Sequence, residues 1–312
     1  MMSRTHAAAV VVALTPALLA FPPSRALGQA LEGIEFEGPI TAATANSITV
    51  MGIVVAVRGG TLSTPTNPAV PLTALAAPLP GRPQGFIGGT AIVEGTSTAG
   101  QVTANPAPGS VFSDVSENVV VGEATDPDGN PATQHVNGLE LRRSIDPRIP
   151  GAPPHDGFGF EIRPETITAG TLLSAEGYWS ETDAALHWHD LESDAAQLVR
   201  PGQHEVSVLR ARCRKEGEEL EIRGGAHLPL PATATAIGRV RVTALDQGGA
   251  TVAGPFTVPV TPVADQLGFG RWRLSADDLT FTACPAAVLA QLLPPLAGEN
   301  VLASAQKELE ER

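Results

Sequence analysis

The residues best suited to chemistry are the histidines of the run His187-Trp188-His189-Asp190. If this run is a β-strand, residues two apart point to the same side, so His187 and His189 could bind one zinc ion with Asp190 as a third ligand. No further histidine follows at a fixed spacing, and an ordinary polar strand face is the simpler explanation of the run. We keep zinc binding as a hypothesis beside that favoured interpretation.

Aromatic residues gather around the same run. Tyr178, Trp179 and Trp188 are three of the four Tyr and Trp residues in the chain. Aromatic residues on facing strands usually belong to a core, whereas exposed ones would form a platform on which a sugar or peptide stacks. Both interpretations stay open for these three candidate ligand-binding residues.

The two cysteines, Cys213 and Cys284, are the next candidates. A pair of cysteines in an exported chain predicts a disulfide, and closing a loop of about 70 residues would contribute about 4 kcal/mol to stability. Two buried thiols are the alternative. The arginines on both sides of Cys213 would lower its pKa if the thiol were free.

Recognisable catalytic motifs are absent from the sequence: it has no Gly-x-Ser-x-Gly elbow, no phosphate-binding glycine loop and no His-Glu-x-x-His. A non-enzymatic protein is therefore the expectation.

The first thirty residues have the pattern of a secretory leader. Arg4 precedes an apolar run over 7–21, and the small-residue site Gly28-Gln29-Ala30 follows. The run is too short to span a membrane and is interrupted by Pro16, so we expect cleavage after residue 30 and a periplasmic or extracellular protein without a transmembrane segment. The formal net charge of −13 argues against nucleic acid as a partner.

The elements that must position these residues are β-strands, because 32 Gly and 28 Pro leave few long helical stretches. Residues 47–57 alternate apolar side chains on each side of Met51-Gly52, which predicts a hairpin. Residues 136–141 repeat that pattern around Asn137-Gly138.

A second pair of segments, 89–95 and 170–177, recurs at a similar offset, and each is followed by a short strand, 101–105 and 185–190. We infer two copies of one β unit, over 31–116 and 117–198. Each copy holds a proline-rich stretch, 64–84 and 146–155, interpreted as an internal loop; for 64–84 a disordered linker is the alternative.

The turn glycines and valines of the first copy, at 38–40, 50–55, 89–95 and 102–104, resemble small exported bacterial domains of unknown function that occur in tandem. That resemblance implies OB-type β-barrels of five strands. It says nothing about chemistry, although OB barrels often bind oligosaccharides.

Residues 199–286 change pattern, with predicted strands at 206–209, 220–222, 240–242, 256–258, 272–274 and 279–282. Their layout resembles an immunoglobulin-like β-sandwich of bacterial surface proteins. In the tail, 287–312, Val301, Leu302, Ala305 and Leu309 lie at helical spacing, which predicts a short helix packed on its own domain or on a partner.

The expected protein is thus all-β: two OB-like barrels, a sandwich and a C-terminal helix. We expect a binding or scaffolding protein of the cell envelope, whose partner is an envelope protein or a glycan. The alternative is a metal-binding protein or metal-dependent hydrolase that uses His187 and His189.

Overall fold

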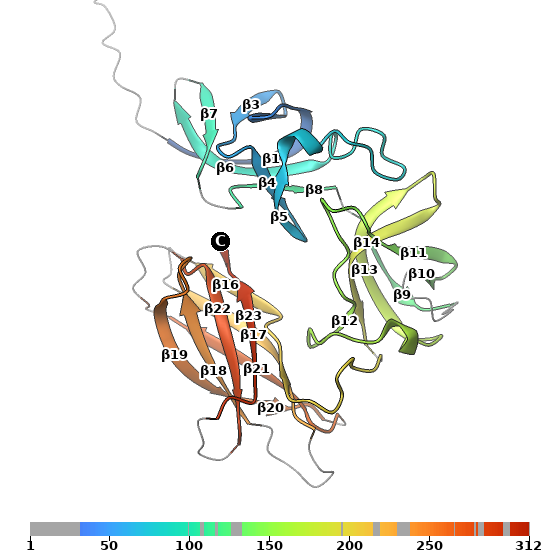
Figure 1. Cartoon of the computed structure of the whole chain (residues 1–312), viewed down its shortest axis with the longest axis vertical. Helices are drawn as coiled ribbons and strands as arrows, with labels where there is room; N and C mark the ends of the chain where they lie inside the picture. Colours follow the sequence, from blue (N-terminus) through green and yellow to red (C-terminus); the bar gives the residue numbers. More distant parts are fainter. Residues whose placement is uncertain are drawn as a thin grey trace, which may run out of the picture.

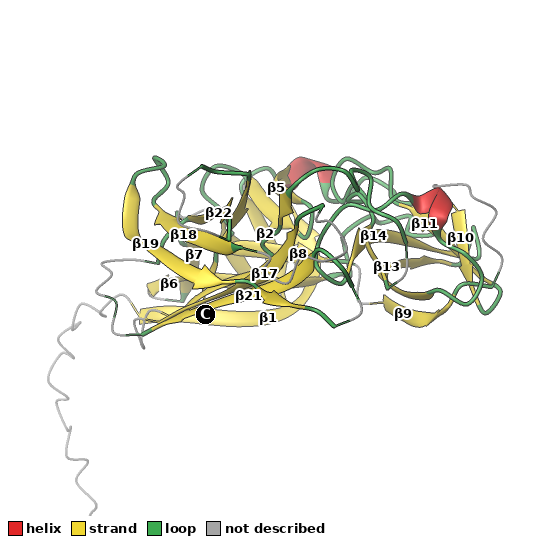
Figure 2. Cartoon of the chain, turned by 90° about the horizontal axis from the view of Figure 1, so that it is seen from below, coloured by secondary structure: helices red, strands yellow, loops and turns green. Residues whose placement is uncertain are grey.

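The fold is all-β in the computed structural model, which describes residues 32–98, 100–106, 109–115, 118–125, 133–194, 196–214, 219–229, 238–264, 266–277, 279, 284–295 and 300–311. Strands make up nearly all of the regular structure (Figure 2), with two short 3-10 turns, η1 (Leu72–Ala74) and η2 (Pro164–Thr166). No helix in these ranges is long and apolar enough to cross a membrane. The predicted leader over 1–30 lies outside the described residues.

The first unit is built around a closed barrel of five strands (Figure 1), in which β1 pairs with both β2 and β6 and the order is β1-β2-β3-β7-β6. The β3–β7 pairing is parallel and the other four are antiparallel. Strands β8, β4 and β5 extend the sheet beyond β6. The bounds are β1 (Glu32–Ala43), β2 (Ser47–Val50), β3 (Ile53–Ala56), β4 (Thr61–Thr64), β5 (Asn67–Pro71), β6 (Thr90–Thr98), β7 (Gln101–Ala104) and β8 (Val111–Asp114).

The second unit repeats this pairing in an open sheet, so the second closed barrel predicted from the sequence is wrong. Its order is β10-β11-β14-β13-β9, β11 and β14 are parallel, and Ala124, just after β9, forms an isolated bridge with Val136 of β10. The short β12 pairs with β14. The bounds are β9 (Asn118–Glu123), β10 (Thr133–Val136), β11 (Leu139–Arg143), β12 (His155–Asp156), β13 (Leu172–Ser180) and β14 (Ala185–Ser193).

Both predicted hairpins are confirmed. Met51 and Gly52 join β2 to β3 with φ values of 51° and 82°, and Asn137 and Gly138 join β10 to β11 with 52° and 82°. Two consecutive residues with positive φ are what a two-residue hairpin turn requires.

The proline-rich stretch 64–84 is an internal loop that packs into the barrel of its own unit. Val70, Leu72, Leu75 and Leu79 are buried in the first core together with Phe86. The linker alternative is therefore wrong, because these apolar side chains lose their water-exposed surface only if the stretch stays folded against the barrel.

The third unit consists of two sheets that share one hydrophobic core. One has the order β20-β21-β17-β16-β24, with β15 on β17, and the other has β19-β18-β22-β23. The bounds are β15 (Glu205–Val206), β16 (Arg210–Arg214), β17 (Glu219–His227), β18 (Arg239–Leu245), β19 (Thr251–Pro259), β20 (Thr261–Pro262), β21 (Phe269–Ala276), β22 (Ala287–Leu293), β23 (Ala303–Glu308) and β24 (Glu310–Glu311).

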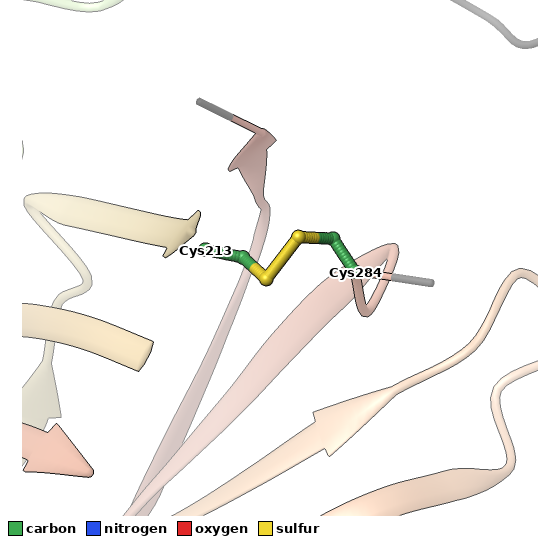
Figure 3. The surroundings of a disulfide bond; sticks show 2 residues. All are labelled: Cys213 and Cys284. Atoms are coloured by element: carbon green, nitrogen blue, oxygen red, sulfur yellow. A yellow bond between two sulfur atoms is a disulfide. The ribbon is translucent and has the colours of Figure 1, made fainter. Parts of the chain in front are cut away.

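The predicted disulfide joins Cys213 in β16 to Cys284, just before β22, and so links the two sheets (Figure 3). Their Cα atoms are 5.9 Å apart and the sequence separation is 71. The two-thiol alternative is wrong.

The predicted C-terminal helix is also wrong. Residues 287–293 and 303–308 form β22 and β23, which pair antiparallel, and β22 lies between β18 and β23. Ala305 in β23 and Leu309 just after it still contact the core, because residues four apart share a strand face as well as a helix face. Leu302 contacts the core from just before β23, and Val301 is exposed. The predicted strand at 206–209 is shorter, ending at Val206, and most of 279–282 lies outside the described residues.

Candidate functional site

The histidines predicted from the sequence lie in β14, but they do not converge. Nε2 of His187 is 2.7 Å from Oδ2 of Asp183, and its ring stacks on Tyr178 with centroids 5.1 Å apart. Both rings are buried. His187 is therefore held by its own neighbours on the side that faces the first unit.

A β-bulge separates His187 from Asp190. Gly177 pairs with Trp188 and Glu176 with Asp190, so His189 is the extra residue. A bulge breaks the alternation of side chains along a strand. Trp188 and Leu191 consequently both enter the second core, and Asp190 turns outward.

Asp190 is bound to a different histidine, His155, whose Nε2 lies 2.9 Å from Oδ1. Burial alone would lower the pKa of His155, but hydrogen bonds to Asp190 and to the Asp156 carbonyl, with the charges of Asp190 and Glu192, raise it to about 9. Burial alone would raise the pKa of Asp190, but the hydrogen bond and charge of His155 lower it. This is a charged pair that ties β12 to β14.

His187 and Asp190, two of the three residues in the zinc hypothesis with His189, therefore have different partners, Asp183 and His155. Within the described ranges, no three His, Cys, Asp or Glu side chains form a group that could hold a metal ion.

The aromatic candidates are placed differently from one another. Trp188 is 0% exposed and Tyr178 1%, whereas Trp179 is 37% exposed. Core packing, one of the two interpretations, therefore holds for Tyr178 and Trp188, and only Trp179 offers a ring to solvent.

A hollow lies elsewhere, between the second and third units. It has a volume of about 670 Å³, within the range of small-molecule sites. On one side its walls come from residues 156–160, which we call the β12 turn, and from the segment after β14. On the other side they come from β17, β21 and the loop before β21. The lining residues are Asp156, Gly157, Phe158, Asp194, Ala196, Gln197, Leu198, Pro201, His227, Val263, Gln266, Leu267, Phe269 and Arg271.

The β12 turn is fixed at both ends. Oδ1 of Asp156 accepts hydrogen bonds from the amides of Phe158 and Phe160, both at 2.9 Å. The hydroxyl of Ser207 donates to the carbonyl of Phe158. The turn therefore reaches the third unit as a preformed loop, which lowers the ordering cost of binding.

A glycine permits this contact. A Cβ atom on Gly225 in β17 would lie 2.8 Å from Cβ of Phe158 and 3.1 Å from its carbonyl oxygen. A larger residue would force the β12 turn away from the sheet, because backbone atoms cannot move aside cheaply. The pair Gly224-Gly225 inside a strand is a sequence signal for such a close approach.

Aromatic rings form the inner wall. The centroids of Phe158 and Phe269 are 5.6 Å apart, and those of His227 and Phe269 are 4.5 Å apart. The guanidinium of Arg271 lies over the Phe158 ring at 5.3 Å. These residues come from segments about 110 residues apart, so sequence spacing could not bring them together.

Two titratable groups of the cavity, Asp156 and His227, have pKa values shifted toward their neutral forms. Burial raises the pKa of Asp156, although its hydrogen bonds from Phe160 and Phe158 oppose the shift. Burial and the charge of His204 lower the pKa of His227, against a bond to the Gln203 carbonyl. Because Nδ1 of His227 donates to that carbonyl at 3.1 Å, Nε2 carries the lone pair and can accept a hydrogen bond.

The comparisons with known proteins add no family: no protein-family model matches this chain, and no curated protein matches it.

Proposed function

We propose that this chain is an exported, non-enzymatic binding protein of the cell envelope, periplasmic or extracellular, which holds a small ligand in the cavity between its second and third units. The observation that carries the proposal is the 670 Å³ hollow with an aromatic wall and a few polar groups, the usual composition of a ligand site.

Two features support export. The leader pattern of residues 1–30 is typical of secretion, and the bond between Cys213 and Cys284 is typical of proteins outside the reducing cytosol.

The architecture supports a binding role. We propose that the first unit is an OB-type barrel and that the second is an open form of it, since each has a mixed sheet of five strands in the same order. We propose that the third is an immunoglobulin-like sandwich, since two sheets share a core. Such modules commonly display binding surfaces on a rigid frame.

The cavity favours binding over catalysis. Oδ1 of Asp156 accepts hydrogen bonds from two amides of its own loop, those of Phe158 and Phe160, so this oxygen is already occupied. His227 is neutral and offers one acceptor. This pair can orient a ligand by hydrogen bonds, whereas nucleophilic catalysis requires a nucleophile beside its base.

Binding can be tested with N-phenyl-1-naphthylamine, a neutral apolar fluorophore. We expect its fluorescence to rise saturably with the protein and the signal to disappear in Ala196→Trp and in Gln197→Trp, which place an indole in the cavity. Trp179→Ala, at an exposed ring elsewhere, is the matched control. A signal that survives both tryptophan variants, checked for folding by thermal unfolding, would refute the cavity as the site.

A further inference from the structure

Beside the cavity described above lies a second hollow of about 410 Å³. The two share Gly157, Phe158 and Arg271, so they meet at the stack of Arg271 on Phe158. Its lining differs in charge: in the part of the chain that the structure describes, it has arginines and no acidic residue. The lining residues are Gly157, Phe158, Leu209, Arg223, Gly224, Thr261, Arg271, Trp272 and Arg273.

The arginines lie together because of strand register. Arg223 in β17 is directly opposite Arg273 in β21 and, on its other side, opposite Arg210 in β16. Directly opposed residues point to the same face with Cβ atoms about 5 Å apart. Arg271 is two residues before Arg273 and so lies on that face as well.

These charges are only partly compensated. Arg273 contacts Glu221 at 3.1 Å. Among the described residues, neither Arg223 nor Arg271 has a carboxylate within ion-pair distance, and Arg271 lies over an aromatic ring instead. Nε of Arg210 is buried and likewise has no hydrogen-bond partner in those residues.

Like charges placed opposite each other on a sheet destabilise it. A chain with a formal net charge of −13 has few basic residues, and four of them meet on one face of three neighbouring strands. An anion bound between them would remove the repulsion, and guanidinium groups bind carboxylate, sulfate and phosphate oxygens through paired hydrogen bonds.

We propose that the ligand is an amphipathic anion: its apolar body occupies the larger cavity, and its carboxylate, sulfate or phosphate group binds Arg223, Arg271 and Arg273. This rests on the proposed function, because it assigns the chemical class of the ligand for the same site. The stack of Arg271 on Phe158 is the point where apolar body and anionic group would meet.

The test compares two fluorophores with one aromatic body. 8-Anilino-1-naphthalenesulfonate adds a sulfonate to the skeleton of N-phenyl-1-naphthylamine. We expect the sulfonate to bind about tenfold more tightly at low salt and to lose that advantage in Arg223→Gln and at high ionic strength, with the neutral compound unaffected by either. Arg223 is exposed, so the variant should fold, and Arg58→Gln, at an exposed arginine of the first unit, is the charge-matched control.

Displacement by decyl compounds then tests whether binding requires an anionic group. Decanoate, decyl sulfate and decyl phosphate should displace the bound sulfonate, and decanol should do so only weakly. Equal affinity of the two fluorophores, both blocked by Ala196→Trp, would overturn the anion proposal and leave the cavity proposal standing. Failure of both to bind would overturn the two proposals together.

Discussion

The first two units share a strand order but use their proline-rich segments differently. In the first unit the segment folds back, and Leu72 and Leu75 are buried in its own barrel. In the second unit the segment crosses over, and Ile149 is buried in the first unit's core, joined there by Tyr178. The proline-rich segment therefore packs into its own barrel in the first unit and joins two units in the second.

The crossing segment is also held by polar contacts. Arg148 donates to the carbonyls of Ala74 and Ala77 at 2.8 and 2.6 Å and to that of Pro78 at 3.1 Å. Its guanidinium pairs with Asp146 at 2.8 Å. Burial alone would raise the pKa of Asp146, but Arg148 lowers it below its usual range. The comparison implies that the two units unfold together.

The most severe way to break this link is Arg148→Ala. The substitution would leave three carbonyls and the Asp146 carboxylate without their buried partner, so we expect a loss of about 3–5 kcal/mol in the free energy of unfolding, measured by urea denaturation. Arg58→Ala, at an exposed site, should change stability by less than about 0.5 kcal/mol. A loss of that small size at Arg148 would show that the units are held by other contacts.

A smaller effect is expected from Ile149→Ala. Ile149 is 0% exposed, so truncation leaves a cavity in the first core at a cost of about 2–4 kcal/mol. Ile145, four residues earlier, is 92% exposed, and Ile145→Ala is the matched control with little effect. The telling measurement is hydrogen exchange: faster exchange in β2 and β3 of the first unit, caused by a substitution in the second, would show that their stabilities are coupled.

This crossing could not be predicted from the sequence. Met51-Gly52 and Asn137-Gly138 reveal both hairpins because a turn is a local feature, and the disulfide follows from the presence of only two cysteines. Ile149, by contrast, packs about 80 residues from its partners, and nothing in its own segment indicates which core it enters.

The candidate site was missed for a related reason. The rule that residues two apart share a face placed His187 and His189 together, with Asp190 nearby, and the bulge at His189 breaks that rule. Phe158, Phe269 and Arg271 meet only because two units pack against each other. The C-terminal tail shows the same limit, since its apolar spacing fits a helix until β22 provides a strand to pair with.

The stability of the two units should depend differently on pH. Residues 32–116 contain no histidine, whereas His155 and Asp190 form a charged pair in the second unit. The folded pKa of His155, about 9, is above its unfolded value near 6.5. Its contribution is therefore complete below pH 6.5 and is lost as pH rises through 9. We expect wild type to lose about 2 kcal/mol more than His155→Gln between pH 6 and pH 10 in urea denaturation. Parallel pH profiles would contradict the pairing.

The smallest expected effect comes from exchanging the first residues of the two hairpin turns. Met51 and Asn137 occupy the same left-handed conformation, with φ of 51° and 52°, which asparagine tolerates better than methionine. If backbone strain dominates, Met51→Asn should stabilise the protein by about 0.5–1 kcal/mol and Asn137→Met should destabilise it similarly, seen as opposite shifts in Tm. Each side chain, however, also lies close to a glycine of its unit's first strand, Met51 beside Gly38 and Asn137 beside Gly122. Loss of stability in both variants would mean that contacts over these glycines outweigh the turn conformation, and that each unit has adapted its own turn residue.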